Sequence, residues 1–139
     1  MILLTPEIRA QLEANGRDPE ADHLPVAKLF NPLGPGVWLA THLDGDGDTL
    51  WGIADLDLDC VEYGTFSHSE LQGLAVGLGL GIERDILFKT RTPLSVWLAT
   101  ADDAGGIRSA ERIIARLERE SRSILPDQSP TQLTTTSGV

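Results

Sequence analysis

The sequence lacks the residues that mark the most easily identified protein classes. Its 139 residues contain a single cysteine, Cys60, which excludes an internal disulfide and a cysteine-based metal cluster. No apolar run approaches the roughly 20 residues that a membrane-spanning helix needs. The N-terminus has no basic segment before a long apolar stretch, which argues against a signal peptide. We therefore expect a cytoplasmic protein that does not bind membranes.

Positive charge is also scarce. The chain carries 11 Lys and Arg against 21 Asp and Glu, and its formal net charge is -10 at pH 7. No basic residue occurs between Lys28 and Arg84. Nucleic-acid binding depends on basic side chains that neutralise phosphates, so most of this chain would repel duplex DNA. The exception is a C-terminal group of arginines: Arg108, Arg112, Arg116, Arg119 and Arg122.

Length and patterning predict a single α+β domain. We expect an antiparallel sheet of four to five strands, packed by two or three helices. The predicted divisions are an α+β core over residues 1–100, an arginine-rich C-terminal helix over residues 101–125 and a disordered tail over residues 126–139. The tail is predicted to be disordered because Pro, Gln, Ser, Thr and Gly dominate it.

Helix starts are marked by residues that accept hydrogen bonds from the first free amides. Thr5, followed by Pro6, predicts a helix over residues 5–14. Asp103 predicts the start of a last helix over residues 104–124. Ser67 and Glu70 form a capping box for a middle helix that continues to the glycines at 77–81 and buries Leu71, Leu74, Ala75 and Leu78.

Alternating apolar residues predict strands over residues 25–30, 37–43, 49–58, 63–66 and 82–88. The Gly and Asp residues at 44–48 predict a hairpin turn between the second and third of these strands. One face of the third strand begins with Trp51 and Ile53 and continues as Asp55, Asp57 and Asp59. This end of the strand should therefore have one solvated, acidic side.

The acidic residues around this hairpin are the candidate partner-binding surface. They are Asp44, Asp46, Asp48, Asp55, Asp57, Asp59 and Glu62. Metal binding is the competing interpretation, because some of them fall at ligand positions of an EF-hand-like loop. Thr49 replaces the turn glycine of that loop, and its flanks are predicted strands. We therefore expect neither a metal site nor a cofactor, and calcium affinity no tighter than about millimolar.

Charged residues near the predicted last strand form a second candidate group. Glu83, Arg84 and Asp85 lie within an apolar frame. Together with Glu62 they could form a structural ion-pair network or a carboxylate acid–base site. Cys60 is predicted to be a small core residue, because no basic neighbour in the sequence would activate it. No residue is assigned a catalytic role.

Several segments of the chain together resemble a known family. They are Leu3-Leu4-Thr5, Pro25-Val26-Ala27-Lys28-Leu29-Phe30, Trp38, Gly52, Asp55, Glu62-Tyr63-Gly64, Ser67, Glu70-Leu71, and Gly81-Ile82-Glu83-Arg84-Asp85 through Phe88. In order and spacing, the chain over about residues 2–95 resembles the domain-of-unknown-function family numbered 2958. The resemblance implies a small protein of a bacterial plasmid or integrative conjugative element, and it implies no established activity.

Three functional hypotheses follow from these observations. The first is a non-enzymatic acidic binding module that contacts a basic, nucleic-acid-binding protein, for example as an antirestriction-like or anti-defence charge mimic. The second is a metal-dependent hydrolase that uses the Asp cluster. The third is a DNA-associated accessory factor that acts through the C-terminal arginine helix. The sequence indicates no oligomeric state, and it favours the first hypothesis because basic residues are absent from its middle.

The composition of the tail leads to a first prediction. Residues 126–139 have too little apolar content to offset the entropy cost of ordering them. Deleting Pro126 to Val139 should therefore leave the free energy of unfolding unchanged, as measured by urea denaturation of both forms. A clear loss of stability in the truncated chain would show that the tail docks on the domain.

Overall fold

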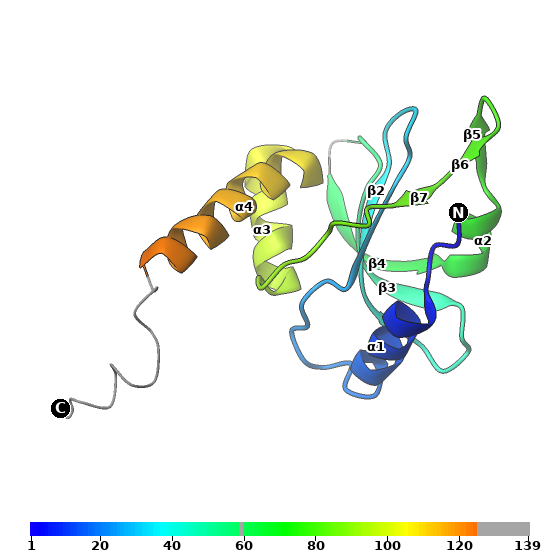
Figure 1. The fold of residues 1–139 in the computed structure, drawn as a ribbon, viewed down its shortest axis with the longest axis horizontal. Helices are drawn as coiled ribbons and strands as arrows, with labels where there is room; N and C mark the ends of the chain where they lie inside the picture. Colours follow the sequence, from blue (N-terminus) through cyan, green and yellow to red (C-terminus); the bar gives the residue numbers. More distant parts are fainter. Residues whose placement is uncertain (59, 125–139) are drawn as a thin grey trace.

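A five-stranded antiparallel sheet is the framework of the α+β fold, as the sequence predicts (Figure 1). The computed structural model describes residues 1–58 and 60–124. The strand order is β4-β3-β2-β1-β7. The bounds are Ala27–Phe30 for β1, Val37–Leu43 for β2, Thr49–Asp55 for β3, Val61–Ser67 for β4 and Glu83–Arg84 for β7. Strands β1 to β4 therefore follow one another in a meander, and β7 returns to pair with β1.

Strand β2 is the centre of the molecule, and every one of its residues is buried. Its Val37 and Leu39 face one layer of helices, whereas Trp38 and Ala40 face the other. A β-bulge between Ala40 and His42 interrupts the pairing with β3. A run of apolar residues, rather than strict alternation, is typical of a strand that is covered on both sides.

The first helical layer consists of α3 (Leu94–Ala104) and α4 (Ile107–Ile124), which lie together on one side of the sheet (Figure 1). Trp97 and Ile107 pack with Leu39 and Ile53 in the core cluster of this side. The buried stripe of α4 ends at Ile114, because the side chain of Leu117 is 55% exposed. Only the N-terminal part of α4 therefore belongs to the core.

The second layer consists of the N-terminal segment, α1 (Pro6–Gly16) and α2 (His68–Gly73) on the opposite side of the sheet (Figure 1). Both predicted caps are confirmed: the Thr5 hydroxyl accepts from the Ile8 amide at 3.2 Å, and the Ser67 hydroxyl accepts from the Glu70 amide at 3.1 Å. Helix α1 lies so close to β2 that a Cβ on Gly16 would stand 2.1 Å from the Leu43 carbonyl oxygen. The core of this side includes Leu3, Leu4, Leu12, Leu29, Leu50 and Leu71.

The predicted length of the middle helix is wrong. Helix α2 ends at Gly73, and the chain continues as a small hairpin of β5 (Ala75–Gly77) and β6 (Leu80–Gly81). Leu78, which the helix pattern placed in the core, has a φ of 54° and is 89% exposed. Leu74 and Leu78 find no apolar layer to pack against, and Gly77 and Gly79 supply a tight turn with positive φ instead.

Several other boundaries differ from the prediction. Strand β3 ends at Asp55 and not at Leu58, and β7 is limited to two residues. The chain near residue 104 forms two helices, because α3 ends at Ala104 and α4 begins at Ile107. Gly105 has a φ of 92° and Gly106 a φ of 157°, conformations that break a helix. Asp103 therefore lies inside α3 and does not cap the last helix.

His68 occupies the first turn of α2 and connects it to α1. An Arg9 guanidinium nitrogen lies 3.3 Å from His68 Nδ1, and a second donates to the Gly47 carbonyl oxygen at 3.1 Å. Burial, and then the nearby charge of Arg9, lower the pKa of His68 below 6.5. Burial and then His23 lower the pKa of His42 in the same direction. The folded chain therefore takes up protons on these imidazoles at lower pH than the unfolded chain.

This difference in proton uptake predicts a pH-dependent stability. A group whose pKa is lower in the folded chain than in the unfolded chain favours folding at any pH above its pKa in the unfolded chain. The free energy of unfolding should therefore fall as the pH drops below about 6.5, because the unfolded chain then binds more protons. Urea denaturation at several pH values between about 7.5 and 5.5 would measure this slope. His68→Asn, which keeps an acceptor near the position of Nδ1, should flatten the slope. Identical slopes for the variant and the wild type would contradict this role of His68.

Candidate functional site

The acidic residues of the predicted surface separate into two groups at opposite ends of β3. Asp44, Asp46 and Asp48 lie in the β2–β3 turn, whereas Asp55 and Asp57 lie where β3 leads into β4. A strand of this length separates its ends by about 20 Å. The prediction that Asp55 and Asp57 share a strand face is wrong, because β3 stops at Asp55. Asp59 lies outside the described residues.

The carboxylates of the β2–β3 turn hold the turn together. Asp44 accepts from the Trp51 indole nitrogen at 2.9 Å, and Asp48 accepts from the Ser69 amide at 2.7 Å. Asp46 accepts from the Thr49 hydroxyl at 2.6 Å and from the Thr49 amide at 2.9 Å. These bonds from Thr49 are the main reason that the pKa of Asp46 falls to about 2. This group is a structural turn, in agreement with the hairpin interpretation.

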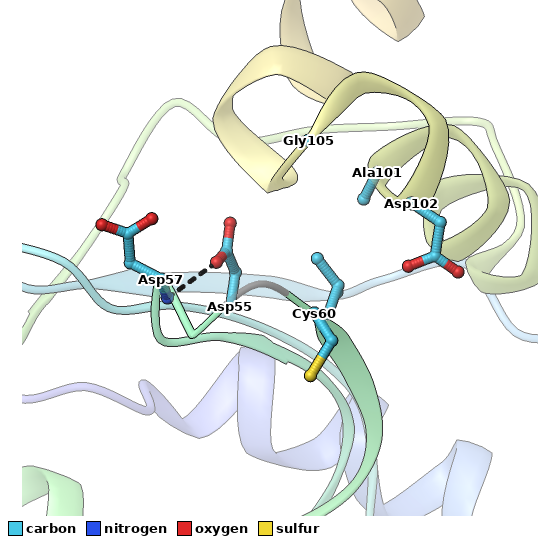
Figure 2. Close-up of a pocket in the computed structure, with 7 residues that line it drawn as sticks. Asp55, Asp57, Cys60, Ala101, Asp102 and Gly105 are labelled. Atoms are coloured by element: carbon cyan, nitrogen blue, oxygen red, sulfur yellow. Dashed lines mark hydrogen bonds between the residues drawn. The ribbon is translucent and has the colours of Figure 1, made fainter.

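The second group borders a cleft of about 190 Å³, which we call the acidic cleft (Figure 2). It lies between the β3–β4 connection and the corner where α3 ends. Its lining residues are Asp55, Asp57, Cys60, Val61, Ala101, Asp102 and Gly105. Sequence reasoning missed Asp102, because only the packing of α3 against the sheet brings it near the β3–β4 connection.

Asp55 connects the sheet to the last helix. Its Oδ2 accepts from the Ile107 amide at 2.9 Å, and its Oδ1 accepts from the Asp57 amide at 3.0 Å. The Ile107 amide is the first of α4, so Asp55 performs the capping role that the sequence assigned to Asp103. Gly106 is required here, because a Cβ at this position would stand 2.7 Å from Asp55 Oδ2.

The chemistry of the acidic cleft suits the binding of a positively charged group. Its lining residues include Asp55, Asp57 and Asp102 but no His, Lys or Arg. Cys60 is exposed, so its predicted place in the core is wrong. Within residues 1–58 and 60–124, no group of three His, Cys, Asp or Glu side chains is arranged to hold a metal ion. Asp57 and Asp102 are exposed and accessible to a partner.

The predicted network around Arg84 has different members. The Arg84 guanidinium donates to the carbonyl oxygens of Ile2 and Leu3, at 2.7 and 2.8 Å, and so fixes the N-terminal segment. Asp85 pairs with Lys28 at 3.5 Å, and Lys28 pairs with Glu111 at 2.7 Å. Glu62 is on the edge strand β4 and Glu83 on the opposite edge strand β7, so the sheet keeps them apart.

The arginine-rich segment forms the exposed side of α4. Arg108, Arg112, Arg116, Arg119 and Arg122 are all exposed. Arg116 forms an ion pair with Glu120, one turn further along the helix, at 3.1 Å. In the part of the chain that the structure describes, no helix has the length and apolar character needed to cross a membrane. Arg108, at the start of α4, lines a neighbouring cleft together with Asp55 and Asp57, so the basic and acidic surfaces meet there.

Comparison with known proteins identifies one relationship. The family model described as "Protein of unknown function (DUF2958)" matches residues 3–108 of the chain. The match includes the whole sheet, α3 and the start of α4, and therefore every described residue of the acidic cleft. No curated protein and no solved structure matches the chain significantly.

The capping role of Asp55 leads to a stability prediction. Asp55→Ala should lower the free energy of unfolding by about 1 kcal/mol, because it removes the acceptor of the first α4 amide. Asp57→Asn is the matched control: it removes a charge from the same cleft, and Asn tolerates the φ of 63° at this position. Urea denaturation should show a loss for Asp55→Ala alone. Equal losses in both variants would indicate that charge, and not capping, matters here.

Proposed function

This chain belongs to the DUF2958 family of proteins of unknown function, and on that premise we propose that it is a non-enzymatic acidic binding module. Its partner is a protein with a basic surface, of the kind that binds nucleic acid. The observation that carries this proposal is the separation of charge. The net charge is -10, and the chain from residue 29 to residue 83 contributes no Lys or Arg.

Some of the acidic residues stabilise the fold, and others are available to bind a partner. Asp44, Asp46, Asp48 and Asp55 hold turns and helix ends, and they add to the negative field. Asp57, Glu62 and Asp102 are exposed and are the proposed contacts for the partner. Asp59, outside the described residues, belongs to the same proposed surface. Fields of this kind raise association rates with oppositely charged surfaces and weaken as salt screens them.

One concrete form of this function is an antirestriction-like or anti-defence inhibitor that imitates the charge of DNA. The mobile-element context that the family resemblance implies agrees with it. The metal-dependent hydrolase receives less support, because Asp55 and Asp57 do not continue one strand face. The exposed arginines of α4 support the third hypothesis, a DNA-associated accessory factor, which the experiment below also tests.

The experiment measures association rates with charge-neutralised variants. The immobilised chain should retain a basic, nucleic-acid-binding protein from a bacterial lysate, and that protein is then purified. Its association rate with the wild-type chain should fall as salt rises from about 0.05 to 0.3 M, while the dissociation rate changes less. The double variant Asp57→Asn/Asp102→Asn should lower the association rate at low salt by roughly an order of magnitude.

The matched control is Glu7→Gln/Glu13→Gln, which removes the same charge from exposed positions of α1 on the other side of the sheet. It should change the association rate much less. A partner that associates equally fast with the wild-type chain and the Asp57/Asp102 variant would exclude the proposed surface. Tight binding to duplex DNA that is lost on replacing Arg112, Arg116 and Arg119 by Gln would favour the accessory-factor hypothesis instead.

A further inference from the structure

A second cleft, separate from the acidic cleft, opens on the same side of the sheet. Its volume is about 270 Å³, and it lies between the loop at residues 19–23, strands β2 and β4, and the first turns of α3. Glu20, His23, His42 and Tyr63 are among its lining residues. We call it the aromatic cleft, because the rings of His23, His42 and Tyr63 line it.

Together with Trp51, these rings follow one another across the loop at residues 19–23 and strands β2, β3 and β4. The His23 and His42 ring centroids are 6.0 Å apart, those of His42 and Trp51 are 5.7 Å apart, and those of Trp51 and Tyr63 are 5.8 Å apart. His42 and Trp51 are nearly parallel, with an interplanar angle of 8°. Asp44 holds the Trp51 indole by its nitrogen. The outermost ring, Tyr63, is 49% exposed and accessible to a ligand.

Charge at the aromatic cleft is negative or neutral. Glu20 and Asp22 line it, and no Lys or Arg does. Asp22 is engaged with α3, because its carboxylate accepts from the Ser95 amide at 3.1 Å, whereas Glu20 is exposed. His42 is only 3% exposed, and burial and His23 lower its pKa, which keeps its ring neutral at pH 7. Burial, Glu20 and Asp44 raise the pKa of Tyr63, so this ring stays uncharged as well.

Neutral aromatic faces beside a carboxylate form a site for an organic cation. We propose that the aromatic cleft binds the guanidinium group of an arginine side chain from a partner polypeptide, stacked on Tyr63 and paired with Glu20. Guanidinium is planar and weakly hydrated, so it stacks on rings and pairs with carboxylates better than the ammonium group of lysine. This inference rests on the proposed function, because a basic protein supplies the arginine.

The chain contains its own reporter for this site. The indole N–H of Trp51 gives a distinct NMR signal, which the variant Trp51→Phe assigns. Addition of N-acetyl-arginine methylamide should shift this signal saturably, with a Kd of about 1 mM, while the signals of buried Trp38 and Trp97 stay in place. N-acetyl-lysine methylamide should bind at least about fivefold more weakly. Equal affinity for the two compounds would overturn the assignment of a guanidinium site.

Two variants separate a built site from a general electrostatic attraction. Glu20→Gln and Glu7→Gln remove the same charge, but Glu7 is exposed in α1 on the opposite side of the sheet. Glu20→Gln should weaken arginine binding at least about fivefold, and Glu7→Gln should leave it nearly unchanged. Equal losses would show that only the overall field attracts the ligand. Tyr63→Leu, with thermal unfolding as a check of folding, should also weaken binding.

The source of the guanidinium group is tested separately. An arginine-containing peptide should bind at least as tightly as the blocked amino acid, and free arginine more weakly, because its carboxylate would face Glu20. Tighter binding of free arginine would overturn the polypeptide source. A captured basic partner whose affinity is unaffected by Glu20→Gln would overturn this inference and leave the proposed function standing. The chain could also bind blocked arginine and yet capture no basic protein. That result would refute the proposed function, and it would also refute a partner polypeptide as the source of the guanidinium group.

Discussion

Helices α2, α3 and α4 begin where a carboxylate from a distant segment accepts from one of their first free amides, whereas the neighbouring Thr5 hydroxyl caps α1. Asp55 accepts from Ile107, 52 residues away, and Asp22 accepts from Ser95, 73 residues away. Asp48 accepts from Ser69 in the same way. The first amides of a helix have no partner within it and carry a partial positive charge, so a carboxylate is well suited to satisfy them. These bonds fix the helices to the strands and loops that they cover.

This use of carboxylates explains how the chain tolerates its charge. Like charges repel one another in a compact state, yet Asp46, Asp48 and Glu118 have a lowered pKa because hydroxyl and amide groups donate to them. The carboxylates without such partners in the acidic cleft lie on the same side of the sheet as the aromatic cleft. Arg108 lines a neighbouring cleft with Asp55 and Asp57, whereas the other arginines lie further along the exposed side of α4. Both clefts therefore present negative charge to an approaching cationic group.

The candidate site was only partly predictable, and particular residues show why. The acids of the β2–β3 turn were recognised as a hairpin, because Asp and Gly at 44–48 have local turn preferences that the strands obey. Asp102 and the aromatic cleft were missed, because His23, His42 and Tyr63 come from separate segments. Arg84 was assigned to its acidic neighbours, although it donates to the backbone of Ile2 and Leu3. Spacing along the chain does not reveal such contacts.

By itself, the sequence determined the features that depend on neighbouring residues: the caps at Thr5 and Ser67, the apolar run of β2, and the acidic, lysine-poor middle of the chain. The tertiary structure decided where β3 and α2 end and which residue caps α4. Asp55, from the sheet, caps α4 in place of the local candidate. Leu78 has no layer to pack against, so the helical pattern around it does not produce a helix. A helix end or a strand end is stable only when its free amides and apolar faces find partners, and those partners are supplied by packing across the whole chain.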